Sequence, residues 1–223
     1  MPAENGIVKI MAGNSREKLL TLLALTACIG AGLSACAPII VGGAVMGSLM
    51  ATDRRTTGTQ VEDEGIELRS GSRIRDNPGE RVHVNVTSYN RQVLLTGEAP
   101  AAQDRQMAEQ VVSKVANVRA IVNEIGILGI TTLSQRANDA YITGKVKAGM
   151  VDTKDLFANA FKVVTERGTV YLMGRVTQRE ANRATDLARS TDGVQRVVRM
   201  LDIISEDELQ NLLPKPAPVE VKK

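Results

Sequence analysis

Two stretches of 16 residues in this chain match in their pattern of apolar residues, and this internal repeat constrains the fold more than any other feature. Residues 82–97 (VHVNVTSYNRQVLLTG) align with residues 159–174 (NAFKVVTERGTVYLMG) at an offset of 77 positions (174 minus 97). At this offset apolar residues meet apolar residues and a glycine meets a glycine: Val84 with Phe161, Val86 with Val163, Val93 with Val170, Leu95 with Leu172 and Gly97 with Gly174. Most of the chain is therefore expected to be one structural unit written twice.

Each copy of the repeat predicts a β-hairpin. Three valines between residues 82 and 86 alternate with polar residues, which places their side chains on one face of a strand. A short polar break follows, with Asn90 in the first copy and Gly168 in the second as the residue that accepts the positive φ of a tight turn. In the second strand of the first copy, Leu94 interrupts the alternation of apolar and polar residues.

A helix and a third strand are predicted after each hairpin. In the second copy Thr177 to Glu180 reads as a capping box, and a narrow alanine-rich stripe follows it. In the first copy Pro100 suits the first turn of the corresponding helix. The third strands then open near Asn117 and Gly193.

A further helix is predicted before each hairpin. In the second copy Ile142, Val146 and Met150 are spaced by four residues within a helix from about Gln135 to Val151. The first copy has a weaker pattern within residues 62–76, where two glycines interrupt it. Its acidic run, residues 62–64, is interpreted as a solvated helix start.

The predicted fold class is α+β, with two tandem α-β-β-α-β domains. Each would be a three-stranded mixed sheet with two helices on one face. The predicted domains cover residues 61–128 and 134–204, and the Pro- and Lys-rich tail, 205–223, is expected to be disordered. Each has roughly 70 residues, near the lower limit for an independent core, which favours docking of one domain on the other.

The amino terminus predicts a lipoprotein signal peptide over residues 1–35. Basic residues precede an uncharged stretch from Leu19 to Ala35, and Leu33-Ser-Ala-Cys36 resembles a lipobox. Cys36 is the favoured lipidation site, followed by a lipidated N-terminus and linker over residues 36–60. Processing at Cys28, an uncleaved anchor and a start at Met11 remain alternatives. Ala37, where an inner-membrane lipoprotein tends to carry Asp, points to the outer membrane.

The composition argues against most enzymes and against nucleic-acid binding. The net charge is +3, aromatic residues are 2% of the chain, and the sequence contains one histidine, His83. Charge-driven nucleic-acid binding needs a larger excess of basic residues, and a catalytic triad or a zinc site would depend on that one imidazole. His83 is interpreted as a surface residue of a strand. No catalytic residue, cofactor or metal ligand is predicted.

The paired units resemble BON domains, with strands that end in Leu-x-Gly and a final Val-x-x-Val-Val strand. The segments that carry the resemblance are Ala51-Thr-Asp53 to Gly58-Thr-Gln60, Asn138-Asp139, Lys145-Val146 and Tyr171-Leu-Met-Gly174 to Ala181. Together with the lipobox they resemble dual-BON outer-membrane lipoproteins of the DolP type. The resemblance implies a periplasm-facing lipoprotein that binds phospholipid through its second domain and supports envelope integrity. Its expected partners are anionic phospholipid membranes and envelope-assembly or division-associated proteins.

The helix before the second hairpin is the candidate membrane contact. With its periodic residues turned inward, Tyr141, Gly144, Lys145, Lys147 and Ala148 are expected outside, where an aromatic ring and lysines suit the headgroup level. The first domain is expected to serve packing or tethering. Two alternatives remain open: a protein adaptor that uses sheet edges or outer sheet faces, and an ion-binding BON module.

Overall fold

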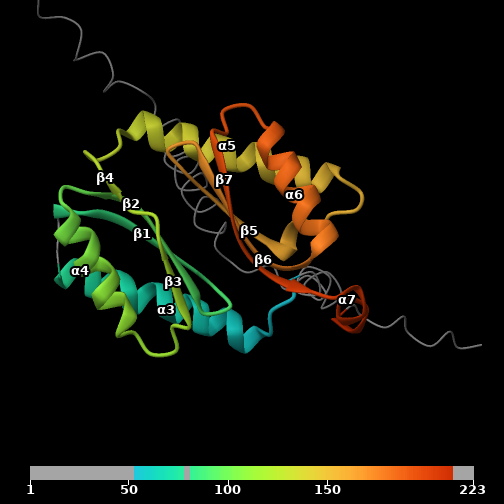
Figure 1. Cartoon of the computed structure of the whole chain (residues 1–223), viewed down its shortest axis with the longest axis horizontal. Coiled ribbons are helices and arrows are strands. Elements are labelled where there is room, and N and C mark those ends of the chain that lie inside the picture. Colours follow the sequence, from blue (N-terminus) through green and yellow to red (C-terminus); the bar gives the residue numbers. More distant parts are fainter. Residues whose placement is uncertain (1–52, 78–80, 213–223) are drawn as a thin grey trace, which may run out of the picture. The chain divides into compact units, whose positions relative to one another are not determined.

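Residues 53–77 and 81–212 are described by a computed structural model of the chain (Figure 1). The first repeat contains α3 (Thr57–Asp76), β1 (His83–Tyr89), β2 (Gln92–Ala99), α4 (Ala102–Ser113), β3 (Ala120–Asn123) and β4 (Gly126–Ile127). The second contains α5 (Leu133–Asp152), a short 3-10 turn (Ala158–Ala160), β5 (Phe161–Glu166), β6 (Thr169–Thr177), α6 (Gln178–Ser190), β7 (Arg196–Ile204) and α7 (Glu206–Leu212). The α-β-β-α-β order is thus confirmed in both repeats.

Each repeat forms its own mixed sheet. In the first, β2 pairs antiparallel with β1 and parallel with both β3 and β4. In the second, β6 pairs antiparallel with β5 and parallel with β7. Two helices cover one face of each sheet: α3 and α4 in the first repeat, α5 and α6 in the second (Figure 1). The predicted α+β class is therefore confirmed, with the third strand of the first sheet divided into two short segments.

The hairpin turns have the backbone that the sequence predicts, and a buried carboxylate supports each of them. Asn90 has φ 49° and Gly168 has φ 70°. In the first repeat Asp63 of α3 accepts hydrogen bonds of 2.7 Å from the backbone N–H groups of Asn90 and Arg91. In the second repeat Asp139 of α5 does the same for Arg167 and Gly168, at 2.8 and 2.9 Å. The leading helix of each repeat is thereby tied to the turn of its own hairpin.

The interpretation of residues 62–64 as a solvated helix start is wrong. Helix α3 begins at Thr57, where Thr56 acts as the N-cap and accepts from the N–H of Thr59. The acidic run therefore lies in the second turn of the helix, and Asp63 is buried. The two glycines do not interrupt α3, because packing of its buried side against β1 outweighs their poor helix propensity.

Two other boundaries differ from the prediction. Helix α4 begins at Ala102, so Pro100 lies before the helix and not in its first turn. Residues 206–212, expected to be part of a disordered tail, form helix α7. Leu209 of α7 is buried, and Glu208 forms an ion pair with Arg175 of β6. Contacts with β6 thus order a segment whose composition by itself predicts no structure.

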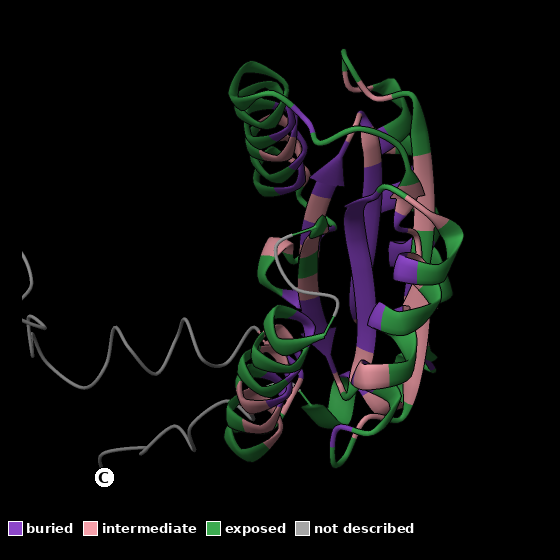
Figure 2. Ribbon diagram, turned by 90° about the vertical axis from the view of Figure 1, so that its left-hand side faces the viewer, coloured by how far each residue is buried: buried purple, intermediate pink, exposed green. Residues whose placement is uncertain are grey.

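The face of each sheet that its helices do not cover packs against the other repeat. Buried residues of both repeats form one apolar cluster there: Tyr89, Leu94, Tyr171, Met173 and Met200. Figure 2 shows buried residues gathered along the strands, with exposed residues on the outward sides of the helices. Leu94 breaks the alternation of β2 because its side chain belongs to this second core. The expected docking is confirmed, and because the two faces cover each other, the adaptor alternative is left with the sheet edges.

Candidate functional site

The outward side of α5 carries a continuous stripe without a charged residue. Ile142, Val146 and Met150 are buried in the core of the second repeat, as predicted. The opposite side exposes residues spaced by three or four positions, which lie in one row along a helix. This outer stripe consists of Leu133, Ala137, Tyr141, Gly144, Ala148 and Val151. Helix α5 is therefore apolar on two opposite sides, although one of them faces solvent.

The predicted contact residues divide between the stripe and its flanks. Tyr141 is 66% exposed, so it does not pack on its own sheet. Gly144 and Ala148 share the outer stripe with it. Lys145 lies on one flank, where its ammonium group sits 5.0 Å from the centre of the Tyr141 ring and donates to the carbonyl of Asp192. Lys147 lies on the opposite flank and is exposed.

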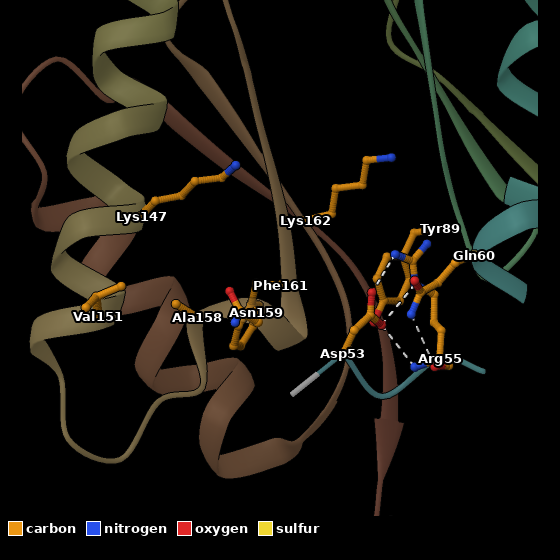
Figure 3. A pocket seen from close by; sticks show the side chains of 10 residues that line it. All are labelled: Asp53, Arg55, Gln60, Tyr89, Lys147, Val151, Ala158, Asn159, Phe161 and Lys162. Atoms are coloured by element: carbon orange, nitrogen blue, oxygen red, sulfur yellow. Dashed lines mark hydrogen bonds and ion pairs between the residues drawn. The ribbon is translucent and has the colours of Figure 1, made fainter. Parts of the chain in front are cut away.

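Lys147 and Val151 also line a hollow of about 630 Å³ at the C-terminal half of α5. Figure 3 shows the remaining walls, which come from the segment before α3, from the first turn of α3, from the first hairpin, and from the 3-10 turn and the start of β5. These residues are Asp53, Arg55, Gln60, Tyr89, Ala158, Asn159, Phe161 and Lys162. Three basic residues and one acidic residue line the hollow, so its charge is positive on balance, and one of its walls is the flank of the outer stripe.

The linker forms one wall of the hollow, and Arg55 fixes this wall in place. Its guanidinium lies 4.2 Å from the centre of the Tyr89 ring and bonds to Asp53 and Asp63, each at 2.7 Å. Burial disfavours the charge of Arg55, but the hydrogen bonds to the two carboxylates outweigh it and hold the pKa above its ordinary value. Burial, with the charge of Asp53 nearby, raises the pKa of Tyr89 to about 12. The phenol therefore stays neutral at physiological pH.

A buried ion pair fastens the linker to the second repeat. Both terminal nitrogens of Arg54 donate to the carboxylate of Glu180 at 2.7 Å, and the two side chains are 5% and 0% exposed. Glu180 also accepts from the N–H of Thr177, which confirms the predicted capping box of α6. Burial by itself would raise the pKa of Glu180. The hydrogen bonds from Arg54 and from the N–H of Thr177 have the opposite and larger effect, so the pKa lies below its ordinary value. The capping-box glutamate thus has a second role, which local sequence did not reveal.

A second buried carboxylate, Glu98, joins the two repeats at the other end of the interface. It accepts from Arg167 of the second repeat at 2.8 Å and is bonded to His83 at 3.0 Å. His83 points away from the valines of its strand, as predicted, and its side chain is 24% exposed, so the predicted surface residue is in fact partly covered at the interface. Burial raises the pKa of Glu98, and the bonds from Arg167 and His83 more than compensate, so the net shift is downward.

Replacement of Glu166 by Gln should stabilise the protein. Burial, with Glu98 and Asp139 nearby, raises the pKa of Glu166, so its charge opposes folding near neutral pH. Glu166→Gln keeps an acceptor for the side chain of Asn85. We expect a gain of up to about 1 kcal/mol in the free energy of unfolding near pH 7.

The gain should disappear once pH falls well below the ordinary pKa of a glutamate, because the wild-type carboxyl is then neutral in both states. Urea unfolding at several pH values measures this, with the exposed Glu206→Gln as the control. A gain that persists in acid would contradict the assignment to charge.

Several expectations concern parts of the chain outside the described residues. Cys36 and the alternative Cys28 both lie there, as does the signal peptide. Among residues 53–77 and 81–212, no helix combines the length and hydropathy needed to cross a bilayer. The same residues contain no group of three or more His, Cys, Asp or Glu side chains placed to hold a metal ion.

Comparisons with known proteins agree with the repeat. The BON domain family model matches residues 62–129 and 138–205. The outer membrane lipoprotein DolP of Haemophilus influenzae is 33% identical over 186 residues, which cover 82% of this chain and 94% of the relative. The 21 kDa hemolysin of Actinobacillus pleuropneumoniae is 31% identical over 154 residues, covering 68% of this chain and 79% of the relative.

A solved structure of CdsD, a structural protein of the type III secretion system of Chlamydia trachomatis, aligns with 67% of this chain and 98% of its own. Its identity to this chain is 13% and the TM-score is 0.28. The sequence relatives and the family match carry the assignment. With both repeats matched and most of its length aligned to the DolP lipoprotein, this chain belongs to the BON domain family and contains two BON domains.

Proposed function

We propose that this protein is a lipid-anchored, periplasm-facing protein of the outer membrane that contacts anionic phospholipid through α5 and supports envelope integrity. The similarity to an outer membrane lipoprotein supports the location. The observation that carries the lipid contact is the outer stripe of α5, an uncharged row along a helix whose other side is already buried.

The chemistry of the stripe and its flanks suits the boundary between headgroups and acyl chains. Tyr141 offers a ring and a hydroxyl, a combination that favours the headgroup level. The small residues Gly144 and Ala148 let the helix approach the bilayer closely. Lys145 and Lys147 flank the stripe on both sides, and each lysine near an anionic surface contributes about 1 kcal/mol.

The path of the linker supports the same orientation. Asp53 lines the hollow together with Lys147 and Val151, so the chain that comes from the proposed anchor reaches the folded part beside α5. Asp53 lies 17 positions after Cys36 (53 minus 36), which allows a reach of at most about 60 Å. An anchor this close keeps the helix at a high local concentration near lipid. A weak intrinsic affinity, in the millimolar range and sensitive to salt, is therefore sufficient.

The corresponding helix of the first repeat, α3, has neither an aromatic residue nor a lysine. Helix α3 exposes Val61 and Leu68 as its large apolar side chains; Glu62 follows Val61 in the sequence, and charged residues stand on both sides of Leu68. A row at the same spacing runs along α3 and is also uncharged, but it holds two hydroxyl residues and no aromatic ring, and Arg75 follows it where α5 has Val151; its members are Thr57, Val61, Gly65, Leu68 and Ser72. The first repeat instead contributes its sheet face to the docking interface and Asp63 and Tyr89 to the linker contacts.

The double variant Tyr141→Ala/Lys145→Glu should lose binding to anionic vesicles. The cores of both repeats and the cluster between them lie within residues 53–212, so a protein of residues 46–223 can be studied without the anchor. Removing the ring and reversing one charge should weaken co-sedimentation with phosphatidylglycerol-containing vesicles at least about tenfold. Thermal unfolding should change little, because Tyr141 is exposed.

The control is Leu68→Ala/Arg73→Glu on α3, which truncates an exposed large apolar side chain and reverses one positive charge on the first repeat. It should bind vesicles as the wild type does. Equal losses in both double variants would show that net charge alone drives binding. Unchanged binding of the α5 variant would refute the proposed contact.

A further inference from the structure

The connection between the two repeats exposes an unusual number of aliphatic side chains. From Ile125 to Gln135 the sequence has no charged residue. Within it Ile127, Leu128 and Ile130 are 49%, 52% and 58% exposed, and Leu133 is 77% exposed. We call residues 126–133 the aliphatic loop. Large aliphatic groups held in water are unfavourable, so a cluster of four in eight positions indicates a contact surface.

The backbone of the aliphatic loop is fixed from the protein side. The N–H of Leu128 donates to the carbonyl of Ala99 at 3.2 Å. Arg167 donates to the carbonyl of Gly129 at 2.6 Å, which ties the loop to the second hairpin. Thr131 is buried and its hydroxyl donates to Glu98 at 3.5 Å. These bonds turn polar groups inward and hold the side chains of residues 127, 128 and 130 toward solvent.

The loop is continuous with the outer stripe of α5, because Leu133 belongs to both. Helix α5 has 20 residues and is about 30 Å long. Its C-terminal end carries Val151, which borders the hollow where the linker arrives. The linker, the outer stripe and the aliphatic loop therefore follow one another along the length of α5.

The order of linker, outer stripe and aliphatic loop along α5 indicates that a bilayer covers the loop. A bilayer contacted along α5 and tethered beside its C-terminal end also meets the loop at its N-terminal end. The loop offers neither charge nor an aromatic ring, the groups on which protein interfaces concentrate their binding energy. Isoleucine and leucine instead favour the hydrocarbon region, where no partner of defined shape is needed.

We propose that the aliphatic loop inserts Ile127, Leu128 and Ile130 into the acyl region of the bilayer as a second point of membrane contact. This inference rests on the proposed function of α5 and extends it. The lysines beside α5 recognise headgroup charge, whereas the loop recognises hydrocarbon. With contacts at both ends, α5 lies parallel to the membrane surface.

The first test compares Ile130→Asp with Leu68→Asp in residues 46–223. Leu68 is an aliphatic residue of similar exposure on α3, so it controls for the added charge. Ile130→Asp should weaken co-sedimentation at least about tenfold with anionic vesicles and with purely zwitterionic vesicles, because it acts on hydrocarbon contact. Leu68→Asp should bind as the wild type does to both.

The second test measures depth and does not depend on loss of binding. Residues 46–223 contain no cysteine, so Ile130→Cys and Leu68→Cys each provide one labelling site for an environment-sensitive dye. The dye at position 130 should shift to the blue on vesicle addition and be quenched by spin-labelled acyl chains, and the dye at position 68 should do neither.

The outcomes separate the two proposals. If Tyr141→Ala/Lys145→Glu abolishes binding while Ile130→Asp binds normally and the dye at position 130 stays in water, the loop proposal is overturned and the α5 contact stands. If the wild-type protein binds neither kind of vesicle, both fail. A dye at position 130 that is buried by a second copy of the chain, seen as a shift without vesicles, would assign the loop to a protein interface and also overturn the proposal.

Discussion

Glu180→Gln should lower the free energy of unfolding by about 3–5 kcal/mol, as expected when one partner of a buried ion pair is removed. The guanidinium of Arg54 would remain buried without its countercharge, since it is 5% exposed and bonded to both carboxylate oxygens. The variant should also release the linker from the second repeat. Urea unfolding measures the first effect, and amide hydrogen exchange at residues 53–56 measures the second.

The same replacement at an exposed pair provides the control. Glu206 lies 3.6 Å from Arg179, and both side chains are about half exposed, so Glu206→Gln should cost less than about 1 kcal/mol. Arg54→Met combined with Glu180→Leu should recover part of the loss, because no buried charge is left unpaired. A loss below about 1 kcal/mol for Glu180→Gln would mean that the pair is open to water, and the linker would not be fixed beside α5.

Leu94→Asp should separate the two BON domains. Leu94 is fully buried in the apolar cluster between the sheets, where an aspartate would find no countercharge among the four other buried members of that cluster. We expect a loss of at least about 3 kcal/mol in the stability of the docked state. The core of the first repeat lies on the other face of its sheet and should survive.

Separation predicts two unfolding transitions in place of one cooperative transition, and a larger radius of gyration by small-angle X-ray scattering. Leu68→Asp adds the same charge at an exposed position of the same repeat and should leave both measurements unchanged. The docking of the sheets would be contradicted if Leu94→Asp unfolded in a single transition with the same denaturant midpoint as the wild type. Vesicle binding by α5 should survive the separation, because its outer stripe is formed within the second repeat.

Local sequence determined the repeated unit and much of the candidate site. The spacing of Ile142, Val146 and Met150 fixed the inward side of α5 and thereby placed Tyr141 outside. Asn90 and Gly168 marked the turns, and Thr177 with Glu180 marked the start of α6. These features depend on residues only a few positions apart, so the conformational preferences of one short stretch of sequence are enough to predict them.

Tertiary structure alone decided how these parts are joined. Arg54 reads as a linker residue, but its partner Glu180 lies 126 positions away. Leu94 reads as an irregularity of a strand until the second sheet supplies its contacts. Asp63 reads as part of a solvated acidic run, although the hairpin turn, more than 25 positions later, buries it. In each case the residue is stabilised by a partner distant in sequence, and no local pattern encodes which partner the fold will bring to it.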